Sequence, residues 1–113
     1  MHEYSIVRAL LDRVEAEARG HGAVAVRRIL VRIGDSAGVE RDLFATAYAV
    51  FRERTLCESA ELEIEGVATR WQCPHCDASI ASGALLRCQT CDVPAHLVAG
   101  DEIILERVEM EVP

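Results

Sequence analysis

The chain has 113 residues and half of them are hydrophobic, which is enough for one modest core and argues against a disordered protein. Its 19 acidic residues outnumber its 12 basic residues, all of them arginine, and the net charge of −7 argues against a nucleic-acid partner. No segment has the roughly eighteen consecutive apolar residues of a membrane span, and the first residues lack the pattern of a secretory signal. We therefore expect a cytoplasmic protein that binds neither nucleic acid nor membrane.

Two segments carry the three- and four-residue spacing of apolar side chains that is typical of an amphipathic helix. The first runs from Glu3 to Arg19, and the glycines at positions 20 and 22 supply a stop signal. The second runs from about Glu40 to Arg54. Its apolar stripe is predicted to be buried and consists of Leu43, Phe44, Ala47, Tyr48, Val50 and Phe51.

Three segments alternate instead with the period of two that a half-buried strand requires. Residues 24–33 are rich in β-branched side chains. In residues 60–66, apolar side chains alternate with Glu61, Glu63 and Glu65. We expect these glutamates to form a solvated strand face, with docking of a basic partner as the alternative. On the last strand, one side is predicted to carry Ile104, Val108, Met110 and Val112.

Four of the five cysteines lie between the last two strands as two Cys-x-x-Cys pairs, Cys73 with Cys76 and Cys88 with Cys91. Two such turns deliver four thiolates, which match the tetrahedral preference of Zn²⁺. A reducing cytoplasm disfavours disulfides between them. Because four thiolates leave no open coordination position, we predict a structural zinc rather than a catalytic one.

Three other residues could contribute to this chemistry, but simpler roles are expected for them. His75 and His96 could replace a thiolate in acid or under oxidising conditions, yet each is expected to be a solvated or outer imidazole. Cys57 lies outside the two pairs and is predicted to be a small buried hydrophobic residue.

The position of the cysteine pairs between two strands predicts an insertion. The expected fold class is α+β, with two helices packed on a small three-stranded sheet and an inserted zinc-ribbon-like module. The predicted domains are residues 1–68 plus 102–113, and the insert 69–101. Since the insert has few large apolar side chains, metal binding is expected to supply its folding stability.

The chain begins Met1-His2-Glu3, which is ordinary on its own because an N-terminal histidine is usually solvated. Its groups nevertheless form a chelating set. The Met1 amine, the His2 backbone nitrogen and the His2 imidazole can close fused chelate rings around one ion, and planar nitrogen ligands suit Ni²⁺ or Cu²⁺ better than Zn²⁺. A fourth position is open to Glu3, through its backbone nitrogen or its carboxylate, or to a partner's ligand.

The N-terminal Met1-His2-Glu3, the Ile33-Gly34 loop before the second helix, and the paired cysteines together resemble the HypA/HybF family of hydrogenase maturation factors, which are nickel metallochaperones. The resemblance covers nearly the whole chain. It implies a nickel site at Met1, His2 and Glu3, and a structural zinc at the four paired cysteines. It also implies that the protein works with a nickel-handling GTPase and delivers Ni(II) to the hydrogenase large subunit, or to urease.

Two other classes of function are weighed against this hypothesis. Paired cysteine turns are also typical of zinc-ribbon proteins that bind nucleic acid or a protein complex without nickel transfer. Against nucleic acid, Arg87 is the only basic residue of the insert after Arg70, and Trp71 is its only aromatic residue. An enzyme is not expected, because the sequence shows no nucleophile-base set, phosphate-binding loop or metal triad with an open position.

Overall fold

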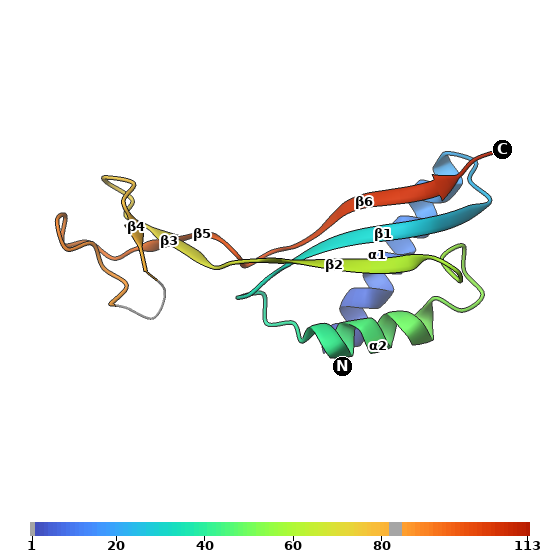
Figure 1. The fold of residues 1–113 in the computed structure, drawn as a ribbon, viewed down its shortest axis with the longest axis horizontal. Helices are drawn as coiled ribbons and strands as arrows, with labels where there is room; N and C mark the ends of the chain where they lie inside the picture. The colour runs from blue at the N-terminus through green and yellow to red at the C-terminus, as the bar shows by residue number, and fades with distance from the viewer. Residues whose placement is uncertain (1, 82–84) are drawn as a thin grey trace. The chain divides into compact units, whose positions relative to one another are not determined.

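The computed structural model describes residues 2–81 and 85–113, which form two compact units. The first unit comprises the described residues up to Arg32, Val39–Glu65 and Ile104–Pro113. The second comprises Ile33–Gly38 and the described part of Gly66–Ile103. In chain order the elements are α1 (His2–Gly20), β1 (Ala25–Gly34), α2 (Arg41–Phe51), β2 (Glu61–Val67), β3 (Arg70–Gln72), β4 (Ser79–Ile80), β5 (His96–Ala99) and β6 (Ile103–Glu111) (Figure 1).

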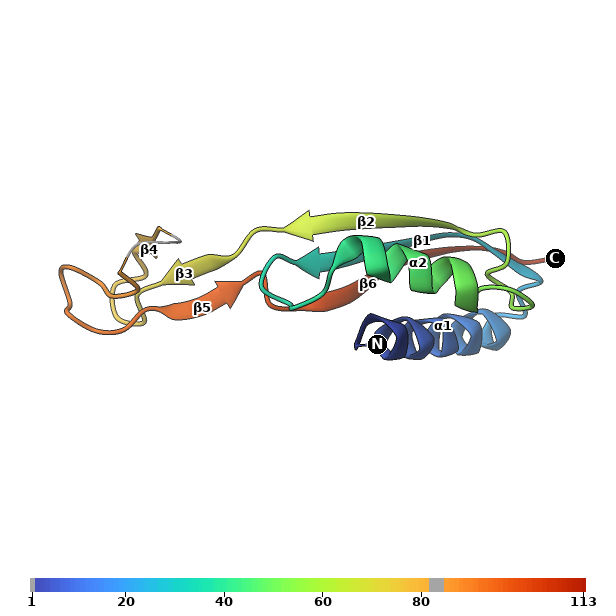
Figure 2. The same ribbon diagram turned by 90° about the horizontal axis from the view of Figure 1, so that it is seen from below.

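The first unit is a sheet of three strands in the order β2-β1-β6, with both helices on one face (Figure 2). The predicted α+β fold is therefore confirmed. The central strand β1 supplies the most deeply buried part of the core, because it is covered by the helices and flanked by a strand on each side. The fully buried large side chains of this unit are Val7, Val14, Val26, Ile29, Val31, Phe44 and Cys57. Burial of each aliphatic or aromatic side chain contributes about 1.5–3 kcal/mol.

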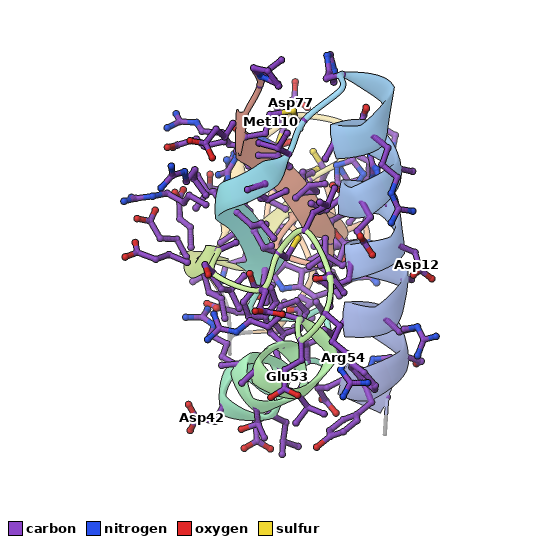
Figure 3. The ribbon with its side chains drawn as sticks, turned by 90° about the vertical axis from the view of Figure 1, so that its right-hand side faces the viewer. Asp12, Asp42, Glu53, Arg54, Asp77 and Met110 are labelled. Atoms are coloured by element: carbon purple, nitrogen blue, oxygen red, sulfur yellow. The ribbon has the colours of Figure 1, made fainter. Side chains whose placement is uncertain are left out.

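The second helix is shorter than predicted, because α2 ends at Phe51 rather than at Arg54. Arg54 has φ 64°, a left-handed conformation that cannot continue the helix. The Thr55 hydroxyl donates to the Arg52 carbonyl at 2.6 Å and closes the turn that follows. Glu53 and Arg54 therefore lie beyond the end of α2 (Figure 3).

Two residues of the predicted apolar stripe of α2 are not buried. The helix packs through Phe44, Ala47 and Tyr48, whereas Leu43 and Val50 are 44% and 54% exposed. Leu43 and Val50 lie at the margin of the stripe, where the packed face of an α-helix ends. The prediction that they belong to the core was wrong.

The outer face of the sheet is a ladder of ion pairs between β1 and β2. Arg28 lies 3.3 Å from Glu61 and 2.5 Å from Glu63, and Arg32 lies 3.4 Å from Glu65. The acidic strand face is solvated as predicted, but its charges are paired within the sheet. These exposed pairs each contribute about 0–1 kcal/mol and leave little unbalanced negative charge on β2 for a basic partner.

The last strand departs from the predicted alternation. Leu105, Val108 and Met110 are half-buried, but Glu106 and Arg107 are two consecutive exposed residues, so burial does not alternate regularly along the strand. Ile104 is 39% exposed and is not part of the core. Val112 follows the end of β6 and is 52% exposed.

The second unit contains a small antiparallel sheet in the order β4-β3-β5. Trp71 of β3 is paired with Ile80 of β4 and with Leu97 of β5. At the other end of the unit, the loop Ile33–Gly38 donates main-chain hydrogen bonds to the segments that flank the module, for example from Ser36 N to Gly100 O at 2.7 Å. In the described part of the chain, no helix is long and apolar enough to cross a membrane.

Candidate metal centres

The four paired cysteines converge in the second unit. Their sulfur atoms all lie within 4.8 Å of one another, and the sulfurs of Cys76 and Cys88 are 3.8 Å apart. A tetrahedron with Zn–S bonds of ~2.3 Å has edges of about 3.8 Å. All four cysteines are free thiols. The donor set and its spacing therefore fit a tetrathiolate zinc ion, as the sequence spacing predicted.

Each Cys-x-x-Cys pair lies in a turn with the same main-chain pattern. The nitrogen of Cys73 donates to Ala78 O, and the nitrogen of Cys88 donates to Val93 O, at 3.0 and 2.9 Å. The residue after each second cysteine is left-handed, with φ 60° at Asp77 and 52° at Asp92. Aspartate tolerates this conformation better than most residues, so the chain can reverse there without glycine.

Main-chain N–H groups also point at the sulfurs. His75 N and Cys76 N lie 3.4 and 3.5 Å from Cys73 Sγ, and Cys91 N lies 3.4 Å from Cys88 Sγ. The hydrogen bond from Cys76 N, assisted by that from His75, lowers the pKa of Cys73 to about 7. Hydrogen bonding to the Cys76 and Cys73 sulfurs raises the pKa of Cys91 to about 12. An incoming metal ion must therefore displace protons from this cluster.

Two of the cysteines, together with Ile33, are the most buried large side chains of the second unit. Cys73 is fully buried and Cys88 is 5% exposed, whereas Leu85 is 81% exposed and Val98 is 39% exposed. We therefore expect the segment that carries the cysteines to depend on a bound metal ion for its packing.

Neither predicted alternative zinc ligand belongs to this cluster. His75 and His96 are exposed, and among the described residues the converging ligand atoms are those of the four cysteines alone. His96 lies on β5 opposite Gln72, which directly precedes Cys73. The expectation that both imidazoles are solvated agrees with their exposure.

The predicted nickel residues lie at the start of α1, except Met1, which lies outside the described residues. The helix begins at His2, whose side chain is exposed. The main-chain N–H groups of His2 and Glu3 belong to the first turn, where a helix offers no internal acceptor. Neither nitrogen therefore donates within the helix, although the Glu3 N–H donates to the Glu3 carboxylate.

The Glu3 side chain has a different environment. It is only 9% exposed, and its Oε2 accepts a hydrogen bond from the main-chain nitrogen of Glu40 at 3.1 Å. This bond, together with one from its own main-chain N–H, lowers the pKa of the Glu3 carboxyl. No sequence signal could have revealed this contact, because Glu3 and Glu40 are brought together only by the packing of α1 on α2.

Comparison with known proteins identifies the family. A family model described as hydrogenase/urease nickel incorporation, metallochaperone, HypA, matches residues 1–110. The chain belongs to the HypA family. The hydrogenase maturation factor HypA of Wolinella succinogenes is 37% identical to it over 98% of this chain and 96% of the relative. That of Nitrosospira multiformis is 38% identical over 97% of each chain.

Two solved HypA structures share the fold. The solution structure of the Ni metallochaperone HypA from Helicobacter pylori matches with a TM-score of 0.74 and 30% identity, and 98% of each chain is covered. A second solution structure of a HypA protein matches with a TM-score of 0.80 and 29% identity, covering 100% of this chain and 98% of that chain. The predicted HypA/HybF resemblance is thus confirmed, and a zinc-ribbon protein unrelated to nickel is not favoured.

Proposed function

We propose that this chain binds one Ni(II) ion at its N-terminus and delivers it during maturation of a nickel hydrogenase, or of urease. The observation that carries the proposal is the start of α1 at His2. It leaves an exposed imidazole beside two main-chain nitrogens, those of His2 and Glu3, that the helix does not use.

The proposed nickel ligands are all nitrogen atoms. They are the Met1 amine, the main-chain nitrogen and imidazole of His2, and the main-chain nitrogen of Glu3. Four nitrogens in a plane suit Ni(II), whereas the four sulfurs of the second unit suit a tetrahedral ion. The two metals are therefore sorted by ligand type and geometry, with zinc as a structural ion held by Cys73, Cys76, Cys88 and Cys91.

The exposure of His2 supports transfer rather than storage. An exposed ligand can be replaced stepwise by an acceptor's ligand, whereas the zinc ligands Cys73 and Cys88 are enclosed. We propose that the chain works as a carrier and not as an enzyme, with a GTPase partner in the cytoplasm and the hydrogenase large subunit as acceptor. The description of the family, hydrogenase/urease nickel incorporation, supports an acceptor of this kind, and the GTPase is part of the proposal.

The two functions would then belong to different parts of the chain. Residues 1–68 plus 102–113 would form the nickel-binding domain, and residues 69–101 the zinc-binding insert. The separation of the described residues into two compact units supports this division, although the loop Ile33–Gly38 packs with the second unit.

A matched pair of histidine variants tests the nickel site. His2→Ala should abolish high-affinity nickel binding in calorimetry and leave the zinc content at one ion per chain. His21→Ala is the control, because His21 is also exposed but follows the opposite end of α1. This variant should bind nickel as the unaltered protein does. Undiminished nickel affinity in His2→Ala would refute the proposed site.

A further inference from the structure

We propose that the exposed side of α2 is an interface for a second copy of this chain, with the two α2 helices packed antiparallel about a two-fold axis. The proposal goes beyond nickel binding and does not depend on it. Three features of α2 support it: an uncharged exposed side, a hollow at its C-terminal end, and the order of charges along the helix.

The exposed side of α2 carries no charge over about two turns. The exposed residues of this stretch are Leu43, Ala45, Thr46, Ala49 and Val50. The Thr46 hydroxyl donates to Asp42 O at 2.9 Å, so its hydrogen bond is made within the helix. A helix on the surface of a soluble protein usually has charged or polar side chains on its outer side. An uncharged outer side is typical of a helix that is covered by another protein.

The spacing of these residues suits the packing of a second helix. Leu43, Thr46 and Val50 share one side of α2, because residues three and four apart lie above one another on a helix. The small side chains of Ala45 and Ala49 allow a second helix to approach to about 8–10 Å. In an antiparallel pair, Leu43 of one copy lies beside Val50 of the other. Each copy then covers the two large apolar side chains that the other leaves 44% and 54% exposed.

A hollow begins at Ala49 and continues past the end of α2. Its volume is about 380 Å³, and it is lined by Ala49, Arg52, Glu53, Arg54 and Glu58. In the antiparallel pair, the first turn of one α2 lies over the hollow of the other copy. The arginine side chains of the hollow can therefore receive a carboxylate from that first turn.

The order of charges favours a second copy of the chain over an unrelated helix. Asp42 lies in the first turn of α2 and Arg54 follows its last turn, and both are exposed (Figure 3). Antiparallel packing places Asp42 of each copy near Arg54 of the other. This pair is centred on residue 48 and the Leu43–Val50 pair between residues 46 and 47, a mismatch of roughly 2 Å along a helix. A long arginine side chain spans this distance, so one arrangement satisfies both pairs.

The size of the interface predicts a reversible dimer. Two helices of 11 residues cover less surface than the roughly 1,600 Å² of a standard protein interface. We therefore expect association that depends on protein concentration, with monomers at low micromolar concentration and dimers near about 1 mM.

Sedimentation equilibrium of the zinc-loaded chain, with matched alanine variants, tests the interface. Ala49→Glu should keep the protein monomeric up to about 1 mM, because it places an unpaired carboxylate in the uncharged contact. Ala16→Glu is the control, since Ala16 is also an exposed alanine within a helix but lies on α1. This variant should form dimers as the unaltered chain does. Circular dichroism and zinc content show whether each variant is folded.

Charge reversal tests the antiparallel arrangement. Asp42→Arg and Arg54→Asp should each weaken association roughly 5- to 30-fold, since two-fold symmetry creates two such pairs in every dimer. The double variant should recover most of the affinity, because it restores an opposite-charge pair with its members exchanged. Aspartate tolerates the φ of 64° at position 54, so the turn after α2 is kept.

The outcomes are distinct from those that test the nickel site. A chain that stays monomeric up to about 1 mM would overturn the proposal, and so would a dimer that Ala49→Glu leaves intact. A double reversal that fails to recover affinity would rule out the antiparallel arrangement. His2→Ala should form dimers as the unaltered chain does, so the interface and the proposed nickel site can fail separately.

Discussion

Cysteine side chains occupy two different environments in this protein. The four cysteines of the cluster receive main-chain hydrogen bonds or face one another's sulfurs, whereas Cys57 is fully buried in the first unit. Burial, reinforced by the nearby Glu15 carboxylate, raises the pKa of Cys57 to about 11. The prediction that Cys57 is a buried hydrophobic residue is confirmed by this environment.

Cys57 should make the first unit less stable in alkali. The unfolded thiol ionises at about 9.0 and the folded thiol at about 11, so between these values only the unfolded chain loses the proton. Rising pH therefore favours unfolding across this window, and the associated stability is present below it. Urea unfolding of the zinc-loaded protein should show a steeper loss of stability from pH 9 to 11 than Cys57→Ala does. Parallel pH profiles for the two proteins would show that folding does not raise the pKa of Cys57.

A site could be predicted from the sequence where the side chains themselves are the ligands, but a contact between a side chain and the main chain could not. The four cysteines were predicted as one cluster from spacing alone, because each short turn brings two sulfurs to the same side of an ion. The partner of Glu3 was not predictable, because a main-chain N–H carries no signature in the sequence. The exposure of Leu43 and Val50 depends in the same way on which neighbours cover α2.

At the level of secondary structure, periodicity predicted both helices and all three strands of the first sheet. It failed where local backbone geometry decides the outcome, as at the left-handed Arg54 that follows α2. It also failed in β6, where two consecutive residues, Glu106 and Arg107, are exposed and burial does not alternate. The spacing of apolar residues predicts which side chains are buried only where the backbone of the helix or strand is regular.

The second unit contains one close backbone approach that only glycine permits. Gly100 has φ 97°, and a Cβ atom there would lie 2.5 Å from Thr69 Cα. A Cβ atom on Gly34 would lie 2.1 Å from Gly100 O. The main chains of Thr69, Gly100 and Gly34 are therefore in direct van der Waals contact.

Gly100→Ala should loosen this packing. We expect a loss of roughly 2–4 kcal/mol in the stability of the second unit, because the new methyl group meets main-chain atoms and φ stays positive. The measurement is the rate at which a chelator removes zinc, which should rise. Gly20→Ala is the control, since a Cβ atom there has no neighbour within 4 Å and should leave the rate unchanged. Equal zinc release from both variants would argue against a rigid contact at Gly100.

At the scale of the whole molecule, each compact unit has its own source of stability. The first buries aliphatic and aromatic side chains between helices and sheet, and the second buries Cys73, Cys88 and Ile33. The division of the chain could be anticipated from the place of the cysteine pairs between two strands. The inclusion of the loop Ile33–Gly38 in the second unit could not, because it depends on main-chain hydrogen bonds across a large sequence distance.

Removal of zinc should therefore affect the two units unequally. Structural zinc binding is worth about 10–16 kcal/mol, far more than the few apolar contacts of the second unit can replace. Chelation should shift the fluorescence of Trp71, the only tryptophan, while the helical circular dichroism of α1 and α2 remains. If the helical signal disappeared together with the fluorescence change, the first unit would depend on zinc as well.

The Met1 amine and His2 are proposed to hold a transferable nickel ion. Calorimetric nickel titration can compare the chain that has a free Met1 amine with a version extended by a few residues before Met1. The extension converts the amine into an amide and keeps every side chain. We expect one nickel ion bound per chain with the free amine, and loss of this binding in the extended chain with zinc retained. Equal nickel binding by the two proteins would contradict it.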